Sequence, residues 1–131
     1  MIVIDTSALI AVLRREPEAV RFLRIIARSE ACLVSAVSYT ETSVVLAGRS
    51  GDGRVWESLD ALSARAAMQI IPHDAALATI AREAFLRFGK GRHRAALNFG
   101  DCASYALAKA RDLPLLFKCS DFSETDLSAA A

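Results

Sequence analysis

The chain of 131 residues has the length of one ordinary domain, and we treat residues 1–131 as a single domain. Hydrophobic residues make up 53% of it, enough for a proper core, which argues against a disordered chain except in the Ala-rich tail at 128–131. Lys and Arg number 16 against 15 for Asp and Glu, so the overall charge argues neither for nor against a nucleic-acid partner.

The first part of the chain alternates strand and helix. The short β-branched run Ile2–Ile4 predicts a buried strand that ends at Asp5, and capping side chains then begin a helix over 7–15. Pro17 fits the first turn of a second helix, which extends to about Ser29. The next expected elements are a buried strand at 31–37 and a helix from the capping box Ser38-Tyr39-Thr40-Glu41 to about Ala47.

The alternation continues after a glycine-rich loop at 48–53. The expected elements are a helix at 55–67, a strand at 69–72, a helix at 74–88, a basic loop at 90–99, a helix at 102–112, a strand at 114–118 and a turn or short helix at 121–126. The helix at 74–88 has the clearest pattern, because its apolar residues recur three and four positions apart.

Strands that alternate with helices indicate an α/β fold with a parallel sheet covered on both faces. Right-handed crossovers restrict the topology, and the very apolar first strand is expected at the centre. Numbering strands along the chain, we expect the order 3-2-1-4, with a switch point between strands 1 and 4. Ligands bind beyond the carboxyl ends of the strands at such a point.

Four acids from distant parts of the sequence are expected at that edge. They are Asp5 after the first strand, Glu41 in the first turn after the second, Asp101 at the start of the helix that leads into the fourth, and Asp121 after the fourth. Each has an alternative local role: helix caps for Asp5 and Asp101, the capping-box partner of Ser38 for Glu41, and a turn for Asp121. Asp74 follows the outer third strand, and we interpret it as a cap only.

Carboxylates brought close together repel one another unless a cation lies between them. An all-oxygen ligand set favours a hard ion, Mg²⁺ with Mn²⁺ as a substitute, over zinc. Such an ion polarises a phosphoryl oxygen and activates a bound water for in-line attack, and a second ion could stabilise the leaving oxygen. The sequence therefore predicts a metal site that acts on phosphates, with either one ion or two.

Five segments spread over the whole chain carry a family resemblance. They are VIDTSALIAVL, SYTETSVVL, FGKGRHRAALNFGDC, YALAKA and PLLFKCSDFSETD. Together they resemble the PIN-domain ribonucleases, specifically the VapC toxins of bacterial toxin–antitoxin pairs. The resemblance implies a three-layer α/β/α fold and a Mg²⁺-dependent endoribonuclease that hydrolyses RNA phosphodiester bonds.

By position, Asp5, Glu41, Asp101 and Asp121 resemble the acidic quartet of that family, and Asp5 and Asp101 are expected to contact the metal directly. Three polar residues, Thr6, Ser7 and Asn98, are expected to position a water or a phosphate oxygen. Relatives usually have Gly and then an acidic residue or Asn where this chain has Cys119-Ser120. That difference removes a further acid beside Asp121 and leaves its role less defined.

The resemblance also implies partners. A VapB-like antitoxin would cover an apolar groove and block the crevice, and DNA would be bound only through it. A homodimer is expected, through an apolar surface at either Phe22, Leu23 and Ile26 or Val44, Val45 and Leu46. Lys90, Arg92 and Arg94 of the basic loop are expected to contact RNA phosphates, the alternative being a solvated charged face.

A cytoplasmic location with no membrane partner is expected. The three cysteines, Cys32, Cys102 and Cys119, are odd in number and lack C-x-x-C spacing, which argues against a disulfide scaffold or a zinc site and fits a reducing compartment. The N-terminus has no basic segment before its apolar run, unlike a signal peptide. The longest apolar run, 8–13, is far too short to span a bilayer.

Two other functions were weighed. A phospho-acceptor receiver domain shares the doubly wound topology and a late lysine, here Lys118, but the second strand ends in Ser35-Ala36-Val37 and has no acceptor aspartate. A non-catalytic binding module with the same fold is the other alternative. The presence of all four acids argues against loss of the site.

Overall fold

The computed structural model describes residues 1–48, 52–118 and 121–130, so positions 49–51 of the expected glycine-rich loop lie outside it. The elements in chain order are β1 (Ile2–Ile4), α1 (Thr6–Leu13), α2 (Ala19–Arg28), β2 (Cys32–Ser35), α3 (Ala36–Ala47), the 3₁₀ helix η1 (Gly53–Trp56), α4 (Glu57–Arg65), β3 (Gln69–Ile71), α5 (Ala75–Phe88), α6 (Phe99–Arg111), β4 (Leu115–Leu116) and the 3₁₀ helix η2 (Asp121–Glu124). The predicted alternation of strand and helix is confirmed. Among these helices, none has the length and apolar character needed to cross a membrane.

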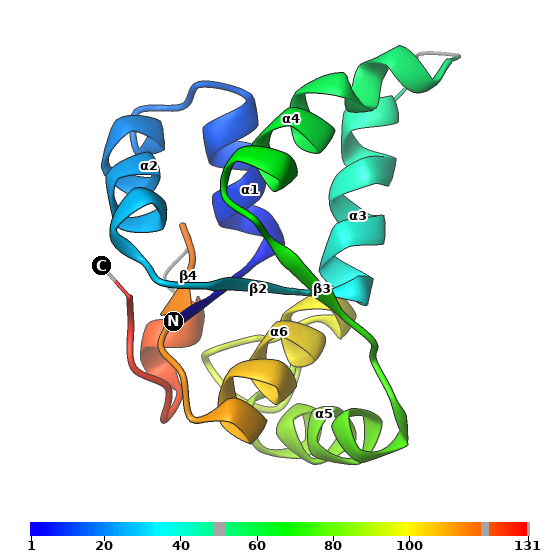
Figure 1. Cartoon of the computed structure of the whole chain (residues 1–131). Coiled ribbons are helices and arrows are strands. Elements are labelled where there is room, and N and C mark those ends of the chain that lie inside the picture. Colours follow the sequence, from blue (N-terminus) through cyan, green and yellow to red (C-terminus); the bar gives the residue numbers. More distant parts are fainter. Residues whose placement is uncertain (49–51, 119–120, 131) are drawn as a thin grey trace.

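The four strands form one parallel sheet in the order β3-β2-β1-β4, which confirms the predicted topology. Helices α1, α2 and α4 lie on one side of the sheet and α5 and α6 on the other (Figure 1). Side chains alternate between the faces along each strand. Val3 therefore packs toward α5 and α6, whereas Ile2 and Ile4 pack toward α1 and α2. Burial on both faces of β1, β2 and β4 explains why these strands read as nearly continuous apolar runs, whereas the edge strand β3 is more exposed.

The structure corrects the predicted boundary between β2 and α3. β2 ends at Ser35, whose Oγ accepts a hydrogen bond from Val37 N–H at 3.2 Å and caps α3. Ser38 and Glu41 then lie inside the helix, so the predicted capping box between them is wrong. Serine is a strong N-cap residue, and the chain uses the one that comes first. Glu41 therefore does not have the alternative role of a capping-box partner of Ser38.

The core also takes up residues that were expected at a dimer surface. Phe22 and Ile26 are 0% and 6% exposed and pack against β1 and β2, so the surface predicted at Phe22, Leu23 and Ile26 is wrong. Only Leu23 reaches the surface, because α2 is amphipathic and turns these two residues inward. The other expected surface keeps Val44, which is largely exposed on α3.

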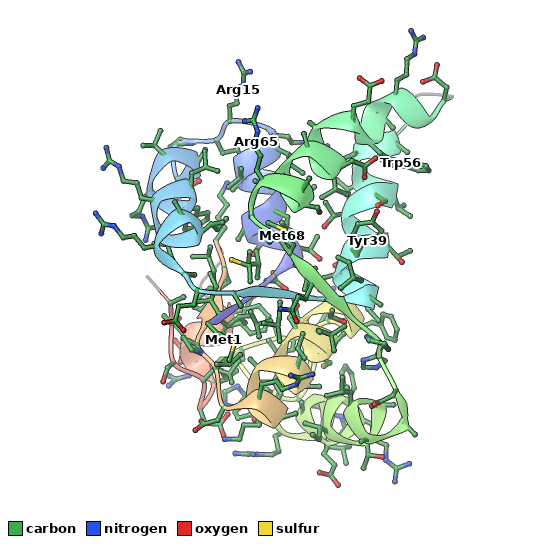
Figure 2. The ribbon with its side chains drawn as sticks, in the orientation of Figure 1. Met1, Arg15, Tyr39, Trp56, Arg65 and Met68 are labelled. Carbon is green, nitrogen blue, oxygen red and sulfur yellow. The ribbon has the colours of Figure 1, made fainter. Side chains whose placement is uncertain are left out.

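Helix α3 is braced by the segment that precedes α4. The Trp56 indole donates from Nε1 to the Ser43 carbonyl at 2.8 Å and lies beside α3 (Figure 2). At the other end of α4, Met68 is directed toward the core between α4 and the sheet. These contacts hold α3, which carries Glu41, against the rest of the domain.

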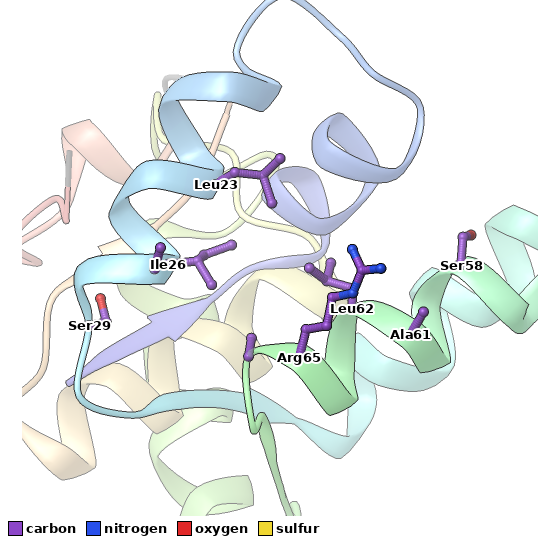
Figure 3. A pocket seen from close by; sticks show the side chains of 9 residues that line it. Leu23, Ile26, Ser29, Ser58, Ala61, Leu62 and Arg65 are labelled. Atoms are coloured by element: carbon purple, nitrogen blue, oxygen red, sulfur yellow. The ribbon is translucent and has the colours of Figure 1, made fainter.

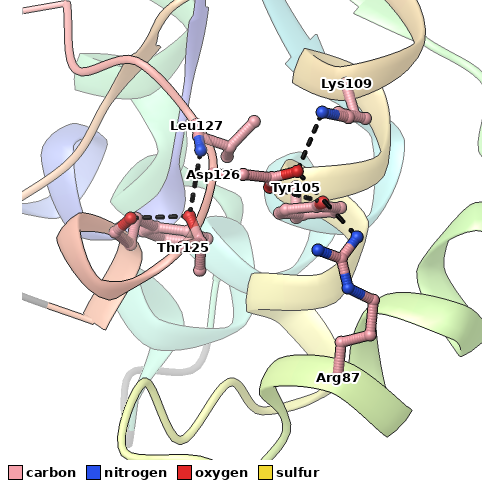
Figure 4. A network of polar contacts seen from close by, with 7 residues as sticks. Arg87, Tyr105, Lys109, Thr125, Asp126 and Leu127 are labelled. Atoms are coloured by element: carbon pink, nitrogen blue, oxygen red, sulfur yellow. Dashed lines mark hydrogen bonds and ion pairs between the residues drawn. The ribbon is translucent and has the colours of Figure 1, made fainter.

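The segment after β4 is anchored on α6 (Figure 4). Asp126 accepts hydrogen bonds from the Tyr105 hydroxyl at 2.7 Å and from Lys109 Nζ at 2.9 Å, and it lies 3.9 Å from the Arg87 guanidinium. Phe122 in η2 is fully buried in the core. This anchoring places the start of η2, with Asp121, beyond the carboxyl end of β4.

Most of the Ala-rich tail is ordered, contrary to expectation. Leu115 N–H donates to the Ser128 carbonyl, and Ala130 N–H donates to the Leu115 carbonyl, both at 2.9 Å. Ala129 forms a parallel bridge with Leu115. The tail thus satisfies backbone groups along the outer edge of β4, which would otherwise stay unpaired. Ala131 lies outside the described residues.

Candidate active site

Asp5 stands at the carboxyl end of the central strand β1 and is 2% exposed. Its Oδ2 accepts hydrogen bonds from Ser7 N–H at 3.0 Å and Ser7 Oγ at 2.7 Å, and its Oδ1 accepts one from Ser104 Oγ at 2.6 Å. The bond from Ser7 N–H is the cap of α1, so the local role foreseen for Asp5 is present. The donor from α6 is additional, and a buried carboxylate needs such donors in place of water.

Glu41 lies against the first turn of α6. Its Oε1 accepts a hydrogen bond from Thr6 Oγ1 at 2.7 Å. A Cβ atom added to Gly100 would come within 2.5 Å of Oε1 and 2.8 Å of Oε2. No side chain fits between them, so glycine at position 100 allows the Glu41 carboxylate to reach the backbone beside Asp101.

Asp101 is the third residue of α6, which begins three residues earlier than predicted because Asn98 caps it. Asn98 Oδ1 accepts from Asp101 N–H and Asp101 Oδ2 accepts from Asn98 N–H, both at 2.9 Å, forming a capping box. The local role foreseen for Asp101 is therefore present too. It occupies only one oxygen: across the described parts of the chain, Asp101 Oδ1 receives no hydrogen bond.

The electrostatics of Asp101 show that the four acids converge. Burial raises the pKa of Asp101 from its usual 3.8 to about 6, even though the hydrogen bond from Asn98 N–H lowers it. The negative charges of Asp5, Asp121 and Glu41 raise this pKa further. Carboxylates from three other segments thus act on Asp101 at the predicted edge of the sheet. Asp74, in contrast, caps α5 by accepting from Leu77 N–H at 3.0 Å, as predicted.

Asp121 opens η2 and is half-buried. The neighbouring Cys119 and Ser120, where the sequence departs from the family pattern, lie outside the described residues. Just before them, Lys118 N–H donates to Ser7 Oγ at 3.0 Å. This bond connects the end of β4 to Ser7, whose hydroxyl in turn donates to Asp5. The Lys118 ammonium contacts Glu16 and Glu18, so its charge is directed at those two carboxylates.

The basic residues of the loop between α5 and α6 differ in whether they form an ion pair. Lys90 and Arg92 are exposed, and neither forms an ion pair with any residue that the structure describes. Arg94 Nε lies 2.7 Å from Glu124 Oε2 and is paired. Asn98, expected to position water or phosphate, has its side-chain oxygen engaged as the α6 cap.

Three residues that contact the site acids or their hydrogen-bond partners, Ser104, Ser38 and Gly100, are not among the site residues predicted from the sequence. Ser104 follows Asp101 by three residues and Ser38 precedes Glu41 by three, so each shares a helix face with a site acid. That spacing is the signal that could have found the two serines. The closeness of Gly100 to Glu41 has no such signal, because it depends on how α3 packs on α6.

The donor set was tested for its fit to a divalent ion. Within residues 1–48, 52–118 and 121–130, no three or more His, Cys, Asp or Glu side chains lie close enough to enclose a metal by themselves. This geometry differs from that of a closed structural zinc site. Mg²⁺, in contrast, takes one or two carboxylates directly and keeps several waters, so it does not require such an enclosure. Direct contact of Asp5 and Asp101 with such an ion, and contact of Glu41 and Asp121 through water, stay predictions.

Comparison with known proteins gives concordant results. A family model described as the PIN domain matches residues 2–127. The chain is 47% identical over 131 residues to a VapC ribonuclease of Mycobacterium bovis, covering 98% of both chains. It is 47% identical over 129 residues to ribonuclease VapC of Mycolicibacterium smegmatis, covering 97% of this chain and 98% of the relative.

Solved structures show the same fold. VapC20 of Mycobacterium tuberculosis, described as a toxin that cleaves the sarcin-ricin loop, matches with a TM-score of 0.74 at 20% identity, covering 97% of this chain and 96% of that one. VapBC2 of Rickettsia felis, solved bound to a promoter DNA fragment, matches with a TM-score of 0.78 at 16% identity, covering 98% and 97%.

These matches exclude the receiver domain and confirm the predicted three-layer α/β/α fold. The family model spans nearly the whole chain, and the relatives are almost half identical over nearly their full length. The chain therefore belongs to the PIN-domain family, among the VapC ribonucleases.

Proposed function

We propose that this chain is an endoribonuclease that hydrolyses RNA with the help of Mg²⁺, for which Mn²⁺ can substitute, and that it is the toxin of a type II toxin–antitoxin pair. The observation that carries the proposal is that Asp5, Glu41 and Asp121 all act electrostatically on Asp101: burial is the main cause that raises the pKa of Asp101 to about 6, and the three negative charges raise it further. A cation relieves this repulsion, and relatives of nearly half-identical sequence are named ribonucleases.

Different residues of the chain would bind the ion and accept the proton. Asp5 and Asp101 would hold the ion, Asp5 oriented by Ser7 and Ser104 and Asp101 through Oδ1, which receives no donor from the residues that the structure describes. When bound, Mg²⁺ lowers the pKa of a coordinated water and polarises the phosphoryl oxygen. Glu41 is held by Thr6 through Oε1, which leaves Oε2 to accept a proton from the attacking water.

The hydroxyls of Thr6 and Ser7 each carry one hydrogen, and both hydrogens are already donated. Thr6 donates to Glu41 and Ser7 donates to Asp5. Their oxygens can still accept a hydrogen bond from a water, but they have no hydrogen left for a phosphate oxygen. Of the two roles foreseen for them, holding a water is the one that this geometry supports.

The partner that we propose is a VapB-like antitoxin, through which alone the chain would reach DNA. The solved relative from Rickettsia felis is a complex of this kind on promoter DNA. An apolar groove between α2 and α4 offers a docking surface (Figure 3), lined by Leu23, Ile26, Ala27, Ser29, Ser58, Ala61, Leu62, Arg65 and Ala66. Leu23 and Ile26 face Leu62 across it, and the Arg65 guanidinium lies at its mouth.

A homodimer is also proposed, with the exposed Val44 on α3 as part of its surface. We place the activity in the cytoplasm, where RNA is available and where the free thiols of Cys32 and Cys102 stay reduced.

The test of the function compares Asp5→Asn with Asp74→Asn. Both residues cap helices and asparagine caps equally well, so both variants keep their helix caps. We expect Mg²⁺ to support cleavage of RNA, EDTA to stop it, and Asp5→Asn alone to lose both cleavage and growth inhibition. Cleavage sites are mapped in total RNA after brief expression. Full cleavage by Asp5→Asn would refute the proposed function.

A further inference from the structure

Helix α6 places a buried hydroxyl directly behind Asp5. Ser104 is 0% exposed and donates to Asp5 Oδ1 at 2.6 Å. Ser38 of α3, also 0% exposed, lies with its Oγ 2.9 Å from Ser104 Oγ. A serine hydroxyl carries a single hydrogen. Because that of Ser104 is donated to Asp5, Ser38 is the donor within the pair, and the hydrogen bonds run in one direction from Ser38 through Ser104 to Asp5.

This chain of hydroxyls occupies a place where packing alone favours apolar residues. The neighbours of Ser104 on the buried part of α6, Ala103, Tyr105 and Ala106, belong to the core or line it. A hydroxyl buried there destabilises the fold unless it finds a partner. A bond to a carboxylate is stronger than one between neutral groups, and a second hydroxyl behind the first strengthens it further.

The contact determines how the Asp5 carboxylate can turn. Both donors from Ser7 act on the same oxygen, Oδ2. They already restrict the last torsion, which is broad in aspartate, because turning the carboxylate would move Oδ2 away from them. Ser104 holds the other oxygen, Oδ1, from the opposite helix. With both oxygens held, the lone pairs that face the crevice have fixed directions.

The same contacts connect Asp5 to Glu41. The Ser38 carbonyl lies 3.4 Å from Thr6 Oγ1, which also donates to Glu41 at 2.7 Å. Ser38 and Glu41 are on the same helix, one turn apart. The position of the serine pair therefore affects the positions of both Asp5 and Glu41.

We propose that Ser104, supported by Ser38, is a positioning residue that sets the plane of the Asp5 carboxylate for the divalent ion. This inference rests on the proposed function and deepens it, since it names residues that prepare the site without contacting RNA. Groups that orient a metal-binding side chain typically change metal affinity or activity by about 10- to 100-fold when they are removed.

The experiment compares Ser104→Ala and Ser104→Cys with the parent protein. Cysteine is somewhat larger than serine and leaves no cavity, but it donates weakly, so the pair of variants separates packing from hydrogen bonding. We expect both variants to bind Mn²⁺ about 10-fold more weakly in calorimetry and to lose kcat by a similar factor, with KM for a model RNA unchanged. Ser38→Ala, which keeps the hydroxyl of Ser104, should shift both quantities in the same direction by less.

The matched control is Thr42→Val. Thr42 is 0% exposed on α3 and donates to the Ser38 carbonyl at 2.7 Å, so the change removes a buried hydroxyl that does not face Asp5. Its Mn²⁺ affinity should equal that of the parent. Equal loss in Thr42→Val and Ser104→Ala would overturn the inference, as would unchanged Mn²⁺ binding in folded Ser104→Cys. A parent protein that neither binds Mn²⁺ nor cleaves RNA would overturn the proposed function itself.

Discussion

In Asp101 one carboxylate serves as helix cap and as candidate metal ligand. Oδ2 completes the capping box with Asn98, and Oδ1 receives no hydrogen bond from the described part of the chain. The sequence analysis weighed these roles as alternatives, but each uses a different oxygen, so they coexist. The raised pKa follows from this arrangement, because burial and three neighbouring charges act on a group that has one hydrogen bond in compensation.

The pKa of Asp101 predicts a dependence on pH. In the folded protein this pKa is about 6, above the value near 3.9 in an unfolded chain, so its protonation stabilises the ion-free fold. That contribution is complete below about pH 3.9 and is lost as the pH rises through about 6. We expect Mn²⁺ to raise Tm more at neutral pH than at about pH 5, where the proton competes with the ion. Melting curves at both pH values, with and without Mn²⁺, measure this, and equal shifts would contradict it.

Gly100→Ala tests the approach of Glu41 to α6. The added Cβ would lie 2.5 Å from Glu41 Oε1, so the carboxylate must move. We expect a destabilisation of about 1–3 kcal/mol, as for other overpacked sites, and a loss of RNA cleavage. Urea denaturation and cleavage assays measure the two effects.

Gly53→Ala is the control for this change, because its Cβ would meet only Trp56, at an ordinary 3.8 Å. If Gly100→Ala cleaved RNA as fast as Gly53→Ala, Glu41 would not need its observed position.

At the scale of elements, the accuracy of each predicted helix start depended on how many residues nearby could act as the N-cap. The helix at 74–88 was placed almost to the residue, because Asp74 and the apolar repeat agree. Helices α3 and α6 both begin about one turn earlier than expected, at Ser35 and Asn98. In both regions several residues can act as caps, and local sequence does not rank them. The choice depends on where the preceding segment leaves the sheet or loop.

The loop between α5 and α6 carries a prediction about RNA affinity. Because Lys90 and Arg92 have no ion-pair partner in the described chain whereas Arg94 is paired with Glu124, the first two should contribute more to binding. We expect Lys90→Ala and Arg92→Ala to raise KM for RNA and to lower the salt dependence of binding, and Arg94→Ala to do so less. Titrations at several salt concentrations measure these slopes. A larger effect of Arg94→Ala would reverse the assignment.

At the scale of the whole molecule, the sheet separates two surfaces with different expected partners. The four acids lie beyond the carboxyl ends of the strands, whereas the apolar groove lies between α2 and α4 on one side of the sheet. Antitoxin and RNA would thus bind through different residues. An antitoxin that blocks cleavage must then extend from the groove to the crevice.

Leu23→Asp tests the groove as the antitoxin surface. Leu23 is 41% exposed and lines it, so a charge there should weaken binding of an apolar segment. Val20→Asp is the matched control, since Val20 is 61% exposed on the same helix but does not line the groove. Co-purification with the neighbouring antitoxin and measured Kd values compare the two. Equal loss of affinity in both variants would place the antitoxin elsewhere.

The sequence by itself determined the alternation of elements, the strand order and the edge at which Asp5, Glu41, Asp101 and Asp121 meet, because hydrophobic periodicity and the handedness of crossovers are properties of the chain. Only the tertiary structure decided which groups touch. Ser104 is 99 positions from Asp5 and Thr6 is 35 from Glu41, and such contacts depend on how helices pack rather than on local pattern. The same packing raised the pKa of Asp101 and buried the Phe22 side chain in the core.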